Sequence, residues 1–249
     1  MLLTVLGGSG AWPTAGQGCS GYLLEHAGFR LLIDPGYATL PRLLEGISAA
    51  AVDAVIVSHG HPDHCADLNP LLRARWLSEV RAQPLPIHAL PGSIDPVLAL
   101  DAPQMLRGSY APHVFEPGDV LTIGPFAVES RAVPHFVPAV AFRITVEGIS
   151  MAYTGDCGPC SDVVHLADQA DLLVAEATFI EQVPPDSVGM LCSSGDAGQQ
   201  ASEGQVRRLV LTHLWPGLDP AQARDQARQF YGGPTDVARP GLTIPLSPH

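Results

Sequence analysis

A short apolar stretch that runs directly into a cluster of histidines constrains this chain more than any other feature of its sequence. Residues Ala54–Ser58 (AVIVS) are apolar up to the closing serine, which is typical of a short buried strand. The next six residues contain His59, His61, Asp63 and His64. A buried strand that ends in four such side chains predicts a metal site beside a sheet.

The spacing within this cluster divides its side chains into two pairs. His59 and His61 are two residues apart, so on an extended segment they project to the same side and can bind one ion. Pro62 then turns the chain, and Asp63 and His64 begin a helix-like turn that suits a second ion. Zinc, iron and manganese all accept imidazole and carboxylate ligands. The sequence therefore predicts two divalent ions, with zinc as the first choice and manganese or iron as alternatives.

The rest of the chain alternates short strands, turns and helices, without a linker or a short-period repeat. Strands are expected at Leu2–Leu6, Gly21–His26, Phe29–Asp34, Val120–Ile123, Phe126–Ala132, Ala141–Val146, Ile149–Thr154, Leu172–Ala175 and Arg208–Thr212. Helices are expected at Asp162–Gln169, around Asp196–Ala201, and at Pro220–Tyr231. Asp219 is the expected cap of the last helix. We expect a single domain over residues 1–249.

Three of the expected strands end in a potential metal ligand. These ligands are His59, Asp156 and His213, which come from distant parts of the chain. Polar side chains at strand ends can meet in one cleft when their strands share an edge. The sequence thus predicts that a site begun at residues 59–64 is completed from the second half of the chain.

Composition limits the kinds of partner. A net charge of −12 with only 13 basic residues argues against a protein whose main task is to grip a nucleic-acid backbone. No apolar run reaches the roughly 18 residues that a membrane span requires, so we expect no membrane association. The five cysteines are irregularly spaced, which favours reduced thiols and a cytoplasmic location.

Further segments, in order along the chain, complete a wider pattern. They are Ile33-Asp34-Pro35-Gly36, Val133-Pro134-His135, Tyr153-Thr154-Gly155-Asp156, Ala175-Glu176-Ala177-Thr178-Phe179 and Leu211-Thr212-His213-Leu214. With these segments the chain resembles the metallo-β-lactamase superfamily, and within it the ribonuclease Z-like branch, over nearly its whole length. The resemblance implies an α/β fold, the αββα sandwich of two mixed sheets flanked by helices, with metal ions at one edge between the sheets.

The same resemblance implies a role for each ligand. The first ion would be held by His59, His61 and His135, the second by Asp63, His64 and His213, and both by Asp156. Asp34 is open to two interpretations. It is either a turn former or a residue that orients the histidine loop.

The implied chemistry is that of a dinuclear metal-dependent hydrolase. Two cations about 3.5–4 Å apart bring the pKa of a shared water near neutrality and hold it as a bridging hydroxide, which attacks the substrate. We expect catalytic roles for Asp63, Asp156 and Glu176. A phosphodiester is the favoured substrate because the pattern is ribonuclease Z-like.

One residue departs from the implied pattern. Members of this branch pair the glutamate with a histidine that opens a later H-x-[ST] segment, and here Leu191 occupies that position. The departure removes a proton donor for a poor leaving group, an effect typically worth about 10²–10⁴ in rate. It keeps two alternatives open: a hydrolase of carboxylic esters, lactones or thioesters, and a metal-binding regulatory protein without efficient turnover.

The expected partner is a small or medium anionic substrate, and homodimer formation stays open. tRNA is not the expected substrate, since the chain lacks a basic Gly/Pro-rich arm. Arg73, Arg75 and Arg81 are sparse, as on a solvated helix face. Cys157-Gly158-Pro159-Cys160 has the cysteine spacing of thioredoxins, but without the preceding tryptophan we favour two thiols near the metal cleft over a redox pair.

Overall fold

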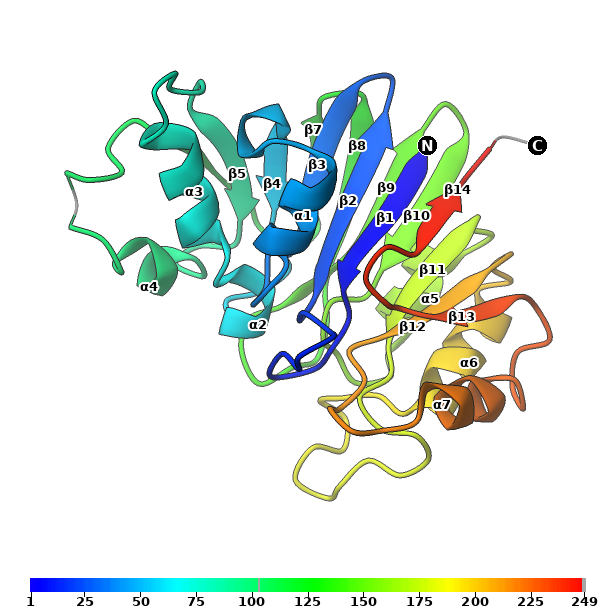
Figure 1. Ribbon diagram of the computed structural model, residues 1–249. Helices are drawn as coiled ribbons and strands as arrows, with labels where there is room; N and C mark the ends of the chain where they lie inside the picture. The colour runs from blue at the N-terminus through cyan, green and yellow to red at the C-terminus, as the bar shows by residue number, and fades with distance from the viewer. Residues whose placement is uncertain (103, 248–249) are drawn as a thin grey trace.

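The computed structural model describes residues 1–102 and 104–247, and they form two seven-stranded mixed sheets packed face to face (Figure 1). The first sheet has the order β14-β1-β2-β3-β4-β5-β6 and the second has the order β13-β12-β11-β10-β9-β8-β7. The strands of the first sheet are β1 (Leu2–Gly7), β2 (Gly21–His26), β3 (Phe29–Ile33), β4 (Ala54–Ile56), β5 (Leu85–Ala89), β6 (Tyr110–Val114) and β14 (Thr243–Pro245). Those of the second are β7 (Val120–Ile123), β8 (Phe126–Ala132), β9 (Val140–Val146), β10 (Ile149–Tyr153), β11 (Leu172–Glu176), β12 (Leu209–Thr212) and β13 (Thr235–Val237).

The two sheets repeat one pairing pattern. From β1 to β6 the pairs are antiparallel twice and then parallel three times, and the same series runs from β8 to β13. The repeat places β3 and β10 in equivalent positions. Asp34 directly follows β3, and Asp156 follows β10 by three residues. Two acidic residues of the site region therefore follow equivalent strands of the two halves.

Side-chain alternation along the strands builds the layers. In β3, Leu31 and Ile33 enter the core between the sheets, whereas Leu32 faces the helices on the outside. In β10, Tyr153 likewise faces the inner core and Ala152 the outer layer. A period of two with apolar residues on both faces is typical of a strand that is covered on both sides.

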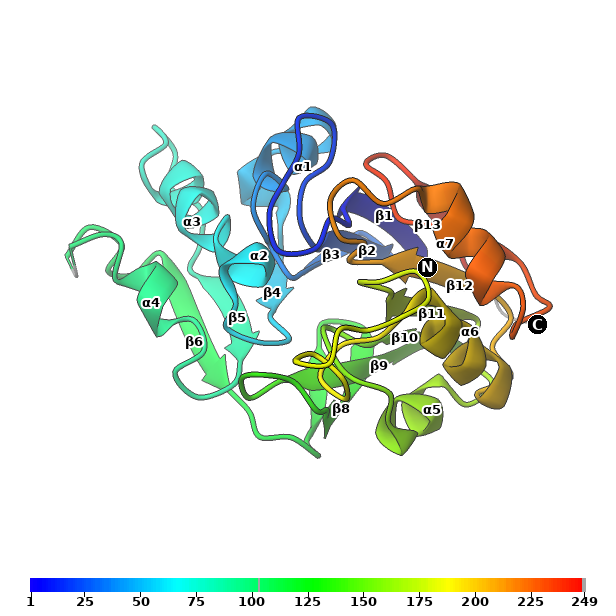
Figure 2. The same cartoon turned by 90° about the horizontal axis from the view of Figure 1, so that it is seen from below.

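Helices cover the outer face of each sheet, as Figure 2 shows from below. The helices beside the first sheet are α1 (Leu40–Gly46), the short 3₁₀ turn at Ala49–Ala51, α2 (Pro62–Cys65), α3 (Leu68–Trp76) and α4 (Asp95–Leu98). Those beside the second are α5 (Ser161–Ala167), α6 (Ser194–Glu203) and α7 (Pro220–Ala227). This αββα architecture confirms the expected fold class. Within the described residues, no helix has the length and apolar character needed to cross a bilayer.

Two features of the first half differ from expectation. The expected strand list lacked β5 and the edge strand β6, which pair in parallel, are interrupted by prolines and follow no clean alternation. Arg75 does not lie on a solvated helix face. It is buried, and its guanidinium donates to the carbonyls of Ala49, Val52 and Gln83, so the buried charge is paired with backbone acceptors.

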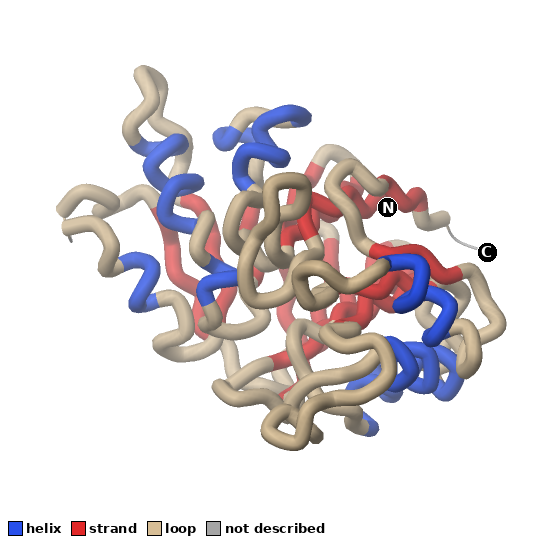
Figure 3. Tube along the Cα trace, turned by 60° about the horizontal axis from the view of Figure 1, so that its bottom comes forward, coloured by secondary structure: helices blue, strands red, loops and turns tan. Residues whose placement is uncertain are grey.

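Sharp turns at strand ends gather the functional side chains at one edge, where long loops come together (Figure 3). Asp34 after β3 and His213 after β12 both have positive φ, at 49° and 59°. Gly155, two residues after β10, has φ 58°. The left-handed conformation is costly for residues other than glycine, and such costs cluster at functional sites. Here each turn redirects the chain so that a side chain enters the site.

Candidate metal centre

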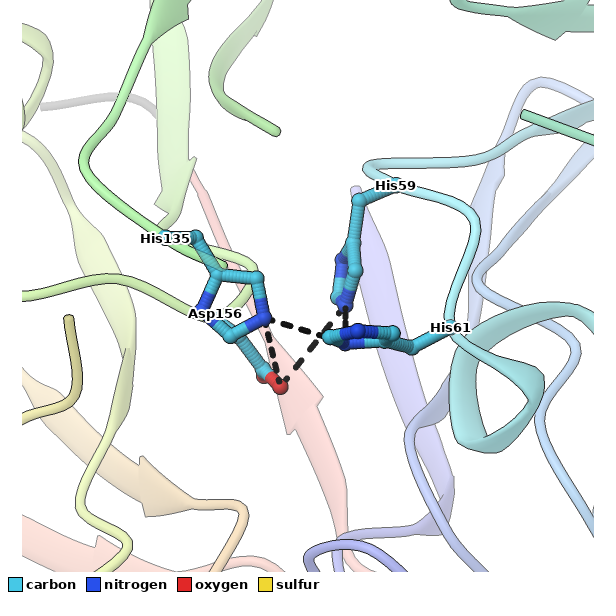
Figure 4. A group of neighbouring side chains, drawn as sticks. All are labelled: His59, His61, His135 and Asp156. Carbon is cyan, nitrogen blue, oxygen red and sulfur yellow. Dashed lines mark hydrogen bonds and ion pairs between the residues drawn. The ribbon is translucent and has the colours of Figure 1, made fainter. Parts of the chain in front are cut away.

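A first group of four ligand atoms comes from three separate segments. His59 and His61 follow β4, His135 lies after β8, and Asp156 follows β10 (Figure 4). Nδ1 of His61 is 3.1 Å from Nε2 of His59 and 3.0 Å from Nε2 of His135. Asp156 Oδ2 is 3.8 Å from the His59 nitrogen. Such spacings suit ligands around one ion with bonds of about 2.0–2.2 Å.

A second group shares Asp156 with the first. It consists of Asp63, His64, Asp156 and His213, all buried. His213 Nε2 lies 3.1 Å from Asp63 Oδ2 and 3.1 Å from Asp156 Oδ2, and His64 Nε2 lies 3.1 Å from Asp156 Oδ1. Within each group the ligand atoms are all within 4.8 Å of one another. The structure thus brings all seven sequence-predicted ligands together, in the two expected sets.

Hydrogen bonds behind the rings fix which nitrogen faces the site. The buried carboxylate of Asp34 accepts from Nδ1 of His64 at 2.8 Å and from the Ser58 hydroxyl at 2.6 Å. Since that hydroxyl donates to Asp34, its oxygen accepts from Nδ1 of His59, 3.0 Å away. Tyr153 donates to the same carboxylate at 2.7 Å. Because Nδ1 donates to these partners, both rings turn Nε2 toward the site.

The rings from the second half are held in the same way. Nδ1 of His135 donates to the Met190 carbonyl at 3.1 Å. Nδ1 of His213 is 2.8 Å from the Thr178 hydroxyl, which in turn donates to Glu176 at 2.6 Å. Ligating histidines almost always carry such a partner on the second nitrogen. His135 and His213 therefore also present Nε2, and His61 alone among the five rings presents Nδ1.

The electrostatics of the two groups differ. Burial lowers the pKa values of His59, His61 and His135, so these rings are neutral and have a free lone pair at neutral pH. Burial acts in the same direction on His64 and His213, but Asp156 outweighs it and raises the pKa of both rings. The first group is therefore ready for a cation, whereas binding at the second releases protons.

The donor set fits divalent metal ions. Nε2 of His64 and Oδ1 of Asp156 are buried without a hydrogen-bond partner. These two atoms lie 3.1 Å from each other but form no aligned hydrogen bond, and a shared cation would satisfy both. Three imidazoles with one carboxylate, and two imidazoles with two carboxylates, are sets that zinc, manganese and iron accept.

Glu176 lies behind the ligands. Its carboxylate accepts from the backbone N–H groups of Cys157 and Cys192, at 2.5 Å and 3.1 Å, and from the hydroxyl of Thr178. Only 1% of the residue is exposed, so the carboxylate has no open face for a substrate. The sequence suggested a direct catalytic role. The geometry supports a positioning role, in which Glu176 acts through Thr178 on His213.

Leu191 is buried in the segment between β11 and α6. Its neighbours in the chain are Met190, whose carbonyl binds His135, and Cys192, whose N–H binds Glu176. The residues on both sides of Leu191 therefore make backbone hydrogen bonds to side chains of the site. No other histidine of the described chain takes the place of the imidazole that the family pattern puts there, since His165 lies on α5 and binds Arg131.

The two cysteines with thioredoxin-like spacing do not form a pair. Cys157 is buried in a cluster with Glu176 and Cys192, whereas Cys160 begins α5 as its cap residue. All five thiols are free. Burial raises the pKa of Cys160, which disfavours a reactive thiolate.

Of the residues that orient the rings, the sequence pointed only to Asp34, for which the structure supports the orienting interpretation. Ser58, Tyr153 and Thr178 lie inside the quoted segments, but only their contacts reveal what they do. The N–H of Ala11 also donates to Asp63 Oδ2 at 2.9 Å. The signal available was a hydroxyl residue close in the sequence to His59, Asp156 and Glu176.

Comparisons with known proteins find relatives that match over nearly the whole of this chain and of their own. The family model of the β-lactamase superfamily domain matches residues 29–214. The probable metallo-hydrolase YhfI of Bacillus subtilis is 31% identical over 97% of this chain and 98% of its own. Ribonuclease Z of Myxococcus xanthus is 27% identical over 98% of this chain and 97% of its own.

Solved structures agree with the fold. The crystal structure of the metallo-β-lactamase fold protein YhfI superposes with a TM-score of 0.89, over 99% of this chain and 98% of that one. The short form of human tRNase Z superposes with a TM-score of 0.82 at 24% identity, over 99% of this chain and all of that one (100%). The second likeness concerns the fold alone.

Proposed function

The chain belongs to the metallo-β-lactamase superfamily and is a metal-dependent hydrolase, and we propose that it hydrolyses a small anionic phosphodiester with two divalent ions, zinc being the preferred metal. The observation that carries this proposal is the position of Asp156. Its two carboxylate oxygens lie 3.1 Å from ring nitrogens of His64 and His213, and the same residue belongs to both ligand groups.

When bound, two divalent ions would lower the pKa of a water to near neutrality and offset negative charge on the phosphate oxygens. The chain's own contribution is preorganisation. Asp34 and Thr178 hold His64 and His213 in one orientation, so the ligands need little rearrangement when a substrate arrives. Burial of Asp63 and Asp156 keeps competing water from these carboxylates.

Two observations support a phosphodiester of small size. One relative, which matches over nearly the whole of both chains, is named ribonuclease Z, and a ribonuclease cleaves phosphodiester bonds. The chain itself contains no lysine and has a net charge of −12, which disfavours a long polyanion. A small phosphodiester carries one negative charge, which the metal ions would offset. Such a substrate agrees with the name of the relative and with the charge of this chain.

A carboxylic ester, lactone or thioester is the second candidate, and Leu191 is the observation that favours it. An apolar side chain at this position supplies no proton to a departing alkoxide. Substrates with better leaving groups tolerate that lack, whereas a phosphodiester with an alkyl leaving group does not.

Metal stoichiometry tests the centre. Protein saturated with zinc and then desalted should contain close to two ions per chain by elemental analysis. His135→Ala should lose one ion, and Asp156→Ala should lose both because it removes the shared ligand. His165→Ala, on α5 away from the site, is the matched control and should keep two. A wild-type protein that binds no zinc, manganese or iron would overturn the proposal.

Substrate class is tested with bis(4-nitrophenyl) phosphate, 4-nitrophenyl acetate, a δ-lactone and a chromogenic β-lactam. We expect turnover of the phosphodiester to exceed that of the others relative to each uncatalysed rate. Leu191→His should raise turnover of a dialkyl phosphodiester, whose alkoxide leaving group needs a proton, about tenfold or more, and should change that of bis(4-nitrophenyl) phosphate much less. Turnover of the acetate or lactone alone would establish the second candidate.

A further inference from the structure

An exposed corner of aromatic rings lies beside the metal centre. Trp12 and Trp215 meet edge to face, with ring centroids 4.9 Å apart and an angle of 84° between the planes. Phe179 stacks on Trp215 at 6.0 Å and 19°. The residues Trp12 and Trp215 remain 46% and 37% exposed, although an indole is normally well covered in a folded domain. Two perpendicular indoles with open surface form a corner that can receive a planar group.

Backbone contacts tie this corner to the metal ligands. Trp12 follows Ala11, whose N–H donates to Asp63 Oδ2. Trp215 lies two residues after His213, and its N–H donates to the Thr178 carbonyl at 3.1 Å. Consecutive Cα atoms are about 3.8 Å apart, so both indoles begin within roughly 8 Å of a ligand residue. The organic part of a substrate bound at the centre would reach the corner.

The two segments that carry the corner are joined to each other. The N–H of Gly10 donates to the Leu214 carbonyl at 2.9 Å, and the loop after β1 runs beside the segment after β12 in Figure 2. A side chain at residue 10 would collide with the ring of His213, since a Cβ there would lie 2.9 Å from Nδ1. The close approach that only glycine permits therefore positions Trp12 beside the metal centre.

A groove shares Trp215 with the corner, although Trp12 does not line it. It has a volume of about 300 Å³, lies between the same two segments and has Gln17 and Arg239 among its polar walls. This is the lower end of the size range of small-molecule sites. Its walls are otherwise mainly apolar, with glycine, proline and leucine, so it suits an organic group better than a second phosphate.

We propose that the corner formed by Trp12 and Trp215 binds an aryl or heteroaryl arm of the substrate by stacking, so that the enzyme prefers compact phosphodiesters with one planar ring system. This inference rests on the proposed function. Stacking of a ring on an aromatic side chain is sequence-tolerant and strong enough to change affinity about tenfold or more. It also needs no basic residue, in agreement with the low basic content of the chain.

The test compares two phosphodiesters that release the same leaving group. Bis(4-nitrophenyl) phosphate keeps an aryl arm, whereas methyl 4-nitrophenyl phosphate keeps only a methyl group, and both release 4-nitrophenolate. In Trp12→Ala and Trp215→Ala we expect kcat/KM for the aryl substrate to fall about tenfold and that for the methyl substrate to change less than about twofold. Trp12→Phe should restore most of the aryl preference, and Trp76→Ala on α3 is the control without effect.

A second readout is independent of turnover. Diphenyl phosphate should compete at least tenfold more strongly than dimethyl phosphate with the wild-type protein, and this advantage should disappear in Trp12→Ala. Zinc content is measured in every variant.

The outcomes separate the two proposals. If the wild type turns over phosphodiesters but the variants keep the aryl preference, or lose both substrates equally, the corner does not bind substrate and the phosphodiesterase function stands. If the zinc-loaded wild type hydrolyses neither phosphodiester, the proposed function fails and this inference fails with it.

Discussion

Asp34 accepts a hydrogen bond from Nδ1 of His64 at 2.8 Å, and both side chains are completely buried. The same carboxylate binds the Ser58 hydroxyl, which supports Nδ1 of His59. One acidic residue that contributes no atom to either ligand group therefore orients a ring in each. Its position after β3, with positive φ, is what aims the carboxylate behind the histidine cluster.

Asp34→Asn should weaken metal binding about 10–100-fold, because the histidines lose the partner that fixes their orientation. Competition with a chromogenic zinc chelator measures this, and the second ion should be affected at least as much as the first because His64 contacts Asp34 directly. Asp101→Asn is the matched control, since Asp101 binds Asn69 and Arg73 away from the site. Unchanged zinc affinity in Asp34→Asn would show that the ring orientation does not depend on this carboxylate.

Thr178→Val tests the positioning role of Glu176. The substitution keeps the side-chain shape but removes the hydroxyl that connects Glu176 to His213. We expect zinc affinity at the second position to fall about tenfold, with little change at the first. Thr122→Val, on exposed β7, is the control. An equal loss of zinc affinity at both positions would contradict the proposal that Glu176 acts through Thr178 on His213.

Gly36→Ala should destabilise the protein. A Cβ at this position would lie 1.8 Å from the carbonyl oxygen of Asp63 and 2.7 Å from that of Ser20, both backbone atoms with little freedom to move. Overpacking of this kind typically costs about 1–3 kcal/mol or more. Gly46→Ala is the matched control, because it meets no atom within 4 Å at the end of α1 and should be neutral or stabilising by up to about 1 kcal/mol. Urea unfolding of the metal-free proteins measures both changes.

His88 should contribute to acid sensitivity. Burial, with a smaller contribution from the stacked ring of His113, lowers the pKa of His88 to about 4 from 6.5. The unfolded chain therefore binds more protons between these values, so the stabilisation is present above pH 6.5 and is lost as pH falls through 4.

The free energy of unfolding falls in both proteins when the pH is lowered from 7.5 to 4. We expect the fall to be about 2 kcal/mol smaller in His88→Leu than in the wild type. Urea titrations of both proteins in the presence of a metal chelator test this. The same decrease in wild type and variant would mean that His88 does not carry this part of the pH dependence.

The sequence was sufficient for the features that depend on local pattern. The apolar stretch before His59, the alternation in strands such as Phe126–Ala132, and the Asp219 cap of α7 all agree with the structure, since each is governed by neighbours along the chain. The elements that it did not predict include the short strands β5, β6, β13 and β14 and the short helices α1 and α4. For these strands the pairing partners, rather than their own residues, determine where they lie.

The sequence predicted the ligand types at residues 59–64, and its resemblance to the superfamily predicted the two ligand sets and the layered fold. The tertiary structure alone decided how they are held. Tyr153 reaches Asp34 across 119 positions, and His213 reaches Asp63 across 150. The packing of one sheet on the other selects such contacts, because many side chains could satisfy the same hydrogen-bonding groups. The metal cluster at residues 59–64 is therefore a property of the sequence, whereas the ring orientations and the aromatic corner beside it are properties of the folded chain.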